Sequence, residues 1–134
     1  MLRLVVPLLL LVAAGCREHS TPADVLGPSE LPVKLRSAAQ ENGVHEATAL
    51  TGARLYATSG CAQCHTYAGV GNRNLGAPDL TAEGAKGKSV GALVEFVRCP
   101  SCADSNTAMP PFKALGPENL RKIAVFLEAS KGKQ

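Results

Sequence analysis

The stretch GCAQCHTYAG, residues 60–69, places two cysteines three positions apart and puts a histidine directly after the second. A second Cys-x-x-Cys pair lies in RCPSCADSNTAMPPF, residues 98–112, where Ala103 stands in the place of the histidine. The two pairs therefore differ in the residue that would add a nitrogen ligand to the two thiols. We expect the two pairs to do different jobs.

Cys61, Cys64 and His65 have the spacing of a c-type haem attachment signature. In this arrangement two thiols form thioethers with the two vinyl groups on one edge of the porphyrin. The adjacent imidazole then binds iron as the proximal ligand. A zinc site is the alternative, because Cys99 and Cys102 would add two further thiolates. Signals elsewhere in the chain agree with haem rather than with zinc.

Met109, in the stretch TAMPPF at residues 107–112, is the one methionine besides Met1. Two prolines follow it, which favours a rigid loop over a buried apolar stripe. A thioether is a soft ligand that favours ferrous iron. We therefore predict Met109 as the distal iron ligand.

Helical periodicity is found in three segments, and no convincing pair of alternating strands accompanies them. The first segment starts at Thr48 as N-cap and runs to Cys61, and the second starts at Ser89. The third has Pro117 at its first position and Gly132 beyond its end. Only 4% of residues are aromatic, so such helices would form a thin core without a cofactor. The residues expected to face inward are Val90, Leu93, Val94, Val97, Leu120, Ile123, Ala124 and Leu127.

Residues 50–131 resemble a bacterial class I monohaem cytochrome c. The pieces that carry the resemblance are GARLYATSGCAQCH, GAPDL, AMPPF and LGPENLRKIAVFLEAS, in this order. The resemblance implies an all-α fold of the class I cytochrome c type, with three to five helices wrapped around one covalently bound haem c.

The same resemblance assigns roles to residues outside the two cysteine pairs. Gly52 corresponds to the small residue at which the first and last helices cross, and Tyr56 to its aromatic neighbour. Phe126 and Leu127 lie on the other helix. Pro78 corresponds to the proline whose carbonyl accepts the proximal histidine N–H, with an ordinary turn proline as the alternative.

Cys99 and Cys102 stand where this family has no required cysteines. A Cys99–Cys102 disulfide is the preferred interpretation, because exported proteins meet an oxidising compartment. Such a bond would close a short loop and stiffen the segment leading to Met109. A free or redox-active dithiol is the second interpretation, and haem or zinc binding the third.

The N-terminal stretch MLRLVVPLLLLVAAGC indicates export. One positive charge precedes an apolar run that is too short for a comfortable membrane span, as in a signal peptide. The small residues before Cys16 resemble the lipobox of bacterial lipoproteins, which implies lipidation of Cys16. We therefore expect a signal peptide over 1–15, a flexible tether over 16–46 and a cytochrome c domain over 47–134. The protein would reside in the bacterial periplasm or cell envelope, held to a membrane by its lipid.

These features predict an electron carrier rather than an enzyme, with no small-molecule substrate at an iron whose axial positions are both filled. The expected partners are redox proteins such as a dehydrogenase, a reductase or an oxidase. A net charge of +3 without basic–aromatic runs does not indicate nucleic-acid binding. The alternatives are a dedicated haem subunit of a larger oxidoreductase, or a haem-based sensor if Met109 is labile.

Overall fold

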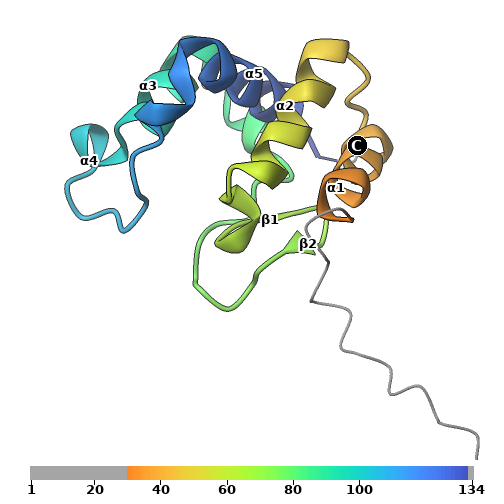
Figure 1. Ribbon diagram of the computed structural model, residues 1–134, viewed down its shortest axis with the longest axis horizontal. Helices are drawn as coiled ribbons and strands as arrows, with labels where there is room; N and C mark the ends of the chain where they lie inside the picture. Colours follow the sequence, from red (N-terminus) through yellow and green to blue (C-terminus); the bar gives the residue numbers. More distant parts are fainter. Residues whose placement is uncertain (1–29, 133–134) are drawn as a thin grey trace, which may run out of the picture.

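The computed structural model describes residues 30–132, which form a mostly helical domain with one two-stranded hairpin (Figure 1). This confirms the predicted all-α fold class. The α-helices are α1 (Leu31–Glu41), α2 (Ala47–Thr58), α3 (Val90–Arg98), α4 (Pro100–Ala103) and α5 (Gly116–Ala129). The shorter elements are the 3-10 turns η1 (Cys61–Gln63), η2 (Glu83–Lys86) and η3 (Lys113–Leu115), and the strands β1 (Thr66–Tyr67) and β2 (Val70–Gly71).

The crossing of α2 and α5 is the most extensive helix contact in the domain, and the two helices overlap at the top of Figure 1. Gly52 makes this approach possible. A Cβ at position 52 would lie 2.6 Å from the carbonyl carbon of Lys122 and 2.8 Å from the Cβ of Phe126. Only a glycine fits between the two backbones, as the resemblance implied.

Three aromatic rings fill the space under this crossing. The Tyr56 and Phe126 rings meet edge to face with centroids 5.7 Å apart, and the Tyr67 and Phe126 centroids are 4.7 Å apart. All three side chains are buried, together with Leu120 and Ile123 of α5. The predicted stripe of the third helix is therefore confirmed, and the core centres on three of the five aromatic residues that the chain has.

The predicted helix starts are partly confirmed. Ser89 caps α3, since its Oγ accepts the backbone N–H of Ala92 at 3.2 Å. Thr48 is wrong as the N-cap of α2, because the helix begins at Ala47 and the carboxylate of Glu46 accepts the N–H groups of Thr48 and Ala49. A carboxylate one position before the helix serves the unpaired N–H groups as well as a hydroxyl would.

The expected tether is wrong over its C-terminal part, because α1 is an ordered helix that packs on α2. Its inward face consists of Leu35, Ala38 and Ala39, all buried. Two of these residues are alanines, so this face is only slightly more apolar than the rest of the helix, and the segment shows no clear apolar period in the sequence. Pro32 falls in the first turn, where proline is compatible with a helix. The domain therefore begins before residue 47.

A buried polar chain joins α1 to the rest of the domain. The side-chain amide of Asn42, at the end of α1, donates to the Tyr67 hydroxyl at 2.8 Å and to the Thr81 carbonyl at 2.9 Å. The Tyr67 hydroxyl lies 3.0 Å from Ser130 Oγ, which itself donates to the Phe126 carbonyl. Tyr67 therefore donates to Ser130, and the chain runs from α1 through β1 to the end of α5.

The hairpin of β1 and β2 was not predicted, because two residues per strand are too few to show an alternating pattern.

The predicted signal peptide and Cys16 lie outside the described residues. Between residues 30 and 132, none of the helices combines the length and the hydropathy that a membrane span requires.

Candidate functional site

The Cys-x-x-Cys-His motif follows α2 directly and forms the turn η1. Gly60, with φ of +89°, reverses the chain at the end of α2 in a conformation that other residues rarely adopt. The backbone N–H groups of Cys64 and His65 both reach the carbonyl of Cys61, at 3.2 and 2.9 Å. The turn therefore holds the two cysteines and the histidine in one compact unit. Cys61 is buried, Cys64 is half-buried and both thiols are free.

The His65 ring is oriented by a single hydrogen bond. Its Nδ1 lies 2.9 Å from the carbonyl oxygen of Pro78. Because a carbonyl only accepts, Nδ1 is the donor, and in the neutral ring Nε2 then keeps its lone pair. This is the tautomer that a metal-binding imidazole needs, with the second nitrogen held by a backbone acceptor.

The segment after Pro78 is fastened to β1 by two hydrogen bonds, and a third closes a turn within the segment at Asp79. Its carboxylate accepts from the Thr66 hydroxyl at 2.6 Å and from the Thr81 N–H at 2.8 Å, and the Leu80 N–H donates to the Thr66 carbonyl. Burial alone would raise the pKa of Asp79, but these hydrogen bonds lower it on balance. The Asp79 carboxylate therefore keeps the Pro78 carbonyl within hydrogen-bonding distance of His65. Sequence reasoning gave Asp79 no role, although an Asp two residues before a Thr is a typical turn pattern.

Tyr56 lies beside the cysteine pair with its hydroxyl buried. Among the described residues this hydroxyl has no hydrogen-bond partner. Burial raises its pKa, and the nearby Cys61 and Asp79 add to the shift. Burial also raises the pKa of the Cys61 thiol, to about 11. The site thus contains a buried polar atom that the protein itself does not satisfy, next to a protonated thiol.

Met109 lies in the loop between α4 and η3 and is half-buried. Its N–H donates to Thr107 Oγ1 at 3.3 Å, and the loop closes where the Phe112 N–H meets the Val97 carbonyl at 3.1 Å. In the described part of the chain, the hydrogen bonds of this loop go to α3, to α4 and to the loop itself. Figure 1 shows this loop at the left of the molecule and the hairpin segment at its lower centre.

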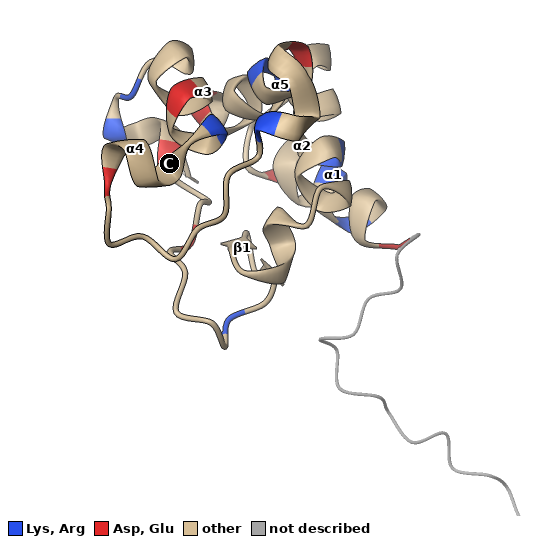
Figure 2. Ribbon diagram, turned by 60° about the vertical axis from the view of Figure 1, so that its left-hand side comes forward, with Lys and Arg blue, Asp and Glu red and all other residues tan. Residues whose placement is uncertain are grey.

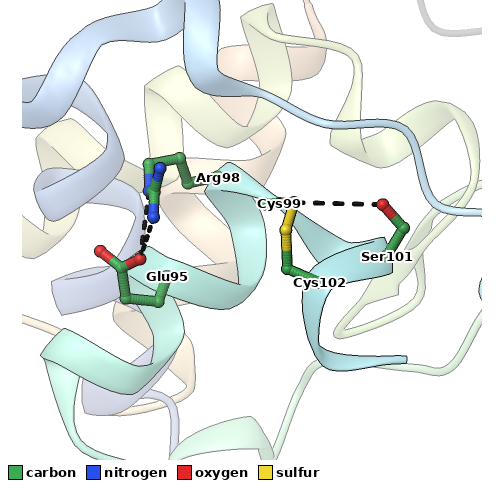
Figure 3. Close-up of a disulfide and its surroundings, with 5 residues drawn as sticks. All are labelled: Glu95, Arg98, Cys99, Ser101 and Cys102. Atoms are coloured by element: carbon green, nitrogen blue, oxygen red, sulfur yellow. Dashed lines mark hydrogen bonds and ion pairs between the residues drawn. A yellow bond between two sulfur atoms is a disulfide. The ribbon is translucent and has the colours of Figure 1, made fainter. Parts of the chain in front are cut away.

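The second cysteine pair forms a disulfide, with the Cys99 and Cys102 sulfur atoms 1.97 Å apart (Figure 3). The two pairs do not share a site. Among residues 30–132 no group of three or more His, Cys, Asp or Glu side chains is arranged to hold a metal ion. The zinc alternative, which needed both pairs together, therefore finds no support in the geometry.

Charged residues are spread over the helices, and both α3 and α5 carry residues of either sign (Figure 2). Many of them pair locally. Lys86 and Lys88 both contact the buried carboxylate of Glu83, at 2.5 and 3.2 Å. On α5, Lys122 pairs with Glu118 one turn earlier. Lys86 and Lys88 are thus engaged within the domain.

The residues present fit a covalently bound haem on three observations. Two free thiols stand at the attachment spacing, His65 carries its proton on Nδ1, and the unsatisfied Tyr56 hydroxyl lies beside Cys61. Cys61 and Cys64 would hold the group and His65 would ligate its iron.

Comparison with protein families agrees with this geometry. Residues 47–127 match the family described as cytochrome c oxidase, cbb3-type, subunit III. No curated protein and no solved structure gave a significant match. The family carries covalently bound haem c, and its cytochrome c domain supports haem-based electron transfer. On the fold, the attachment motif and the family match together, the chain belongs to this family and is a bacterial class I c-type cytochrome.

Proposed function

We propose that this protein is an exported, membrane-anchored electron carrier with one c-type haem, in which His65 and Met109 are the two axial ligands. The observation that carries the proposal is the hydrogen bond from His65 Nδ1 to the Pro78 carbonyl, because it presents Nε2 as the metal-binding nitrogen. When bound, the haem supplies a one-electron couple between ferric and ferrous iron.

The protein residues serve this chemistry by fixing their own positions. Cys61 and Cys64 attach the group to a turn that is closed by its own backbone hydrogen bonds. Pro78, held by Asp79, orients the imidazole. Met109 would be the second protein ligand of the iron, which would leave no place there for a small-molecule substrate. A ligand set that stays in place in both oxidation states keeps reorganisation small and suits an electron carrier rather than an enzyme.

The location follows from the N-terminal sequence. The segment 1–15 acts as a signal peptide, Cys16 takes lipid, and the tether ends before α1 rather than at residue 46. Lipid at Cys16 then holds the domain close to its membrane. The partners are redox proteins with which it exchanges one electron at a time.

Carbon monoxide tests the ligand assignment. The ferrous wild-type protein is expected to keep its visible spectrum when carbon monoxide is added, because Met109 occupies the sixth position. Met109→Ala is expected to give a rapid spectral change under the same conditions. A rapid change in the wild-type protein would contradict the proposal and favour ligand sensing.

A second candidate is a haem subunit within a larger oxidase complex, which the description of the matching family favours. Gently solubilised native membranes, separated on a non-denaturing gel and stained for haem, distinguish the two. The full chain has a mass of 13.9 kDa, so a free carrier that has lost residues 1–15 migrates as a small species even with haem and lipid attached. A dedicated subunit migrates with a much larger assembly.

A further inference from the structure

The Cys99–Cys102 disulfide is open to attack from solvent. Cys102 is exposed and Cys99 is half-buried, and both line an open depression of about 390 Å³ beside α3. The apolar part of its wall comes from Ala92, Phe96 and Ala103. Figure 3 shows the Arg98 side chain turned toward Glu95, to which it is hydrogen-bonded, and away from the sulfur atoms. A thiol in solution therefore has access to the bond.

The disulfide ties down only one end of α4. The bond joins residues three positions apart, so it restricts the unfolded chain little and contributes little to the stability of the whole domain. Pro100 is fully buried, and the Cys99 N–H donates to the Glu95 carbonyl, so the start of α4 is held to α3 without the bond. Cys102 has no such burial. Without the disulfide, the end of α4 would keep the backbone hydrogen bonds from Cys102 to the Cys99 carbonyl and from Asp104 to the Pro100 carbonyl, but it would lose its covalent link, so it would loosen while α3 stays in place.

The loop that carries Met109 is built on this end of α4. The Asp104 N–H donates to the Pro100 carbonyl, the Thr107 N–H to the Asp104 carbonyl, and the Met109 N–H to the Thr107 hydroxyl. Each of these bonds depends on the position of the one before it. Two of these contacts reach the packed part of the domain, the Asp104 bond to the buried Pro100 at one end of the loop and the closing bond at Phe112 at the other, and the bonds between them join loop residues to one another. Its stiffness therefore depends on the disulfide at its entrance.

We propose that Cys99–Cys102 is a thiol–disulfide exchange site, and that its reduction by a dithiol protein loosens the loop that carries Met109. A donor thiolate attacks Cys102 Sγ, the S–S bond breaks, and Cys99 leaves as a thiolate that takes up a proton. The second donor thiolate then attacks the donor sulfur of the mixed disulfide and releases Cys102, which is also protonated. Two electrons pass to the cysteine pair, and the donor becomes a disulfide.

The consequence at the haem rests on the proposed Met109 ligation, whereas the exchange reaction does not. The oxidised state holds Met109 in place for electron transfer. The reduced state makes this ligand easier to displace. The disulfide would thus couple the thiol balance of the cell envelope to the electron carrier.

The test uses the full-length, haem-loaded protein with dithiothreitol as the dithiol, under conditions in which the domain stays folded. Alkylation followed by mass spectrometry counts the thiols that appear, and amide hydrogen exchange reports the loop. We expect two alkylated cysteines and an exchange rate at Thr107 and Met109 that rises about tenfold, with α2 and α5 unchanged. In ascorbate-reduced protein, carbon monoxide should bind about tenfold faster after this treatment. The double variant C99S/C102S should reproduce both effects without dithiothreitol, and Ser105→Ala should not.

Two results would overturn the inference. One is a disulfide that is reduced only as fast as the whole domain unfolds. The other is a disulfide that is reduced while exchange in residues 104–112 stays the same. Oxidised protein that binds carbon monoxide at once would instead disprove the Met109 ligation, and hydrogen exchange would still decide whether reduction loosens the loop.

Discussion

At the scale of single residues, the position of Gly52 sets how closely α2 and α5 approach. Gly52→Ala would place a methyl group against the backbone of Lys122, which cannot move aside without shifting α5. We expect this change to lower the free energy of unfolding by about 3 kcal/mol, as overpacking of a close helix crossing does. Chemical denaturation of the haem-loaded protein measures it.

Gly91→Ala is the matched control for this prediction. Gly91 is also helical, but it is exposed and a Cβ there would meet only Ser89 Oγ, at 3.9 Å. This variant should be neutral or more stable by about 0.5 kcal/mol, because alanine favours the helix. Equal losses in the two variants would show that the crossing does not require a glycine.

Glu83 gives the domain a pH dependence at the residue scale. Burial would raise its pKa, but the hydrogen bonds from Lys86 and Lys88 lower it below the ordinary value of 4.5. The carboxylate thus contributes stability that is complete above pH 4.5 and is lost as the pH falls through the lowered pKa. We expect Glu83→Gln to lower the free energy of unfolding at pH 7 by about 1 kcal/mol. On acidification the variant should lose less of this free energy than the wild-type protein does.

Unfolding curves at several pH values between neutral and acid check this prediction. Glu118→Gln is the comparison, since Glu118 also pairs with a lysine but is 81% exposed, so its pair is screened by solvent. If both variants show the acid response of the wild-type protein, Glu83 does not contribute to it.

At the scale of elements, α1 belongs to the folded domain because of a small buried face. Leu35 is completely buried, whereas Val33, on the same helix, is 65% exposed. Leu35→Ala should therefore lower the free energy of unfolding by about 3 kcal/mol, and Val33→Ala by less than about 0.5 kcal/mol. Thermal unfolding of the two variants tests this, and a neutral Leu35→Ala would mean that α1 does not support the domain.

The elements also show how far the sequence alone could predict the fold. The helix at 90–98 and the last helix were predictable, because their apolar stripes are strong and a serine or a proline marks the start. The Gly52 crossing and the Pro78 contact followed from the resemblance to a family rather than from periodicity. The helix α1 and the hydrogen bonds around Asp79 were not predicted. The first buries small residues of low contrast, and the second consists of hydrogen bonds between segments that only the folded chain brings together.

At the scale of the whole molecule, three of the few aromatic residues gather on the side of the domain that holds the attachment turn. The Phe126 ring contacts the rings of both Tyr56 and Tyr67, and these two tyrosines precede and follow the attachment turn. The stable contacts thus lie on the side of His65, while the loop of Met109 is held by local bonds and one disulfide. A firmly held His65 and a more adjustable Met109 loop fit the proposed electron carrier, in which Met109 would be the ligand open to regulation.

The proposed membrane anchor belongs to the scale of the whole molecule, because it rests on Cys16, which lies outside the described residues. Lipid at Cys16 should be the only link to the membrane if the protein is a free carrier. Cys16→Ser is then expected to move the protein from the membrane pellet to the soluble fraction of the cell envelope, or to leave its signal peptide uncleaved. Fractionation with immunodetection, and the mass of the mature N-terminus, measure both. Cys102→Ser, which also removes one cysteine, should remain in the pellet. A Cys16→Ser protein that stays in the pellet after a high-salt wash, with its signal peptide removed, would show that a protein complex holds the domain and would favour the oxidase-subunit assignment.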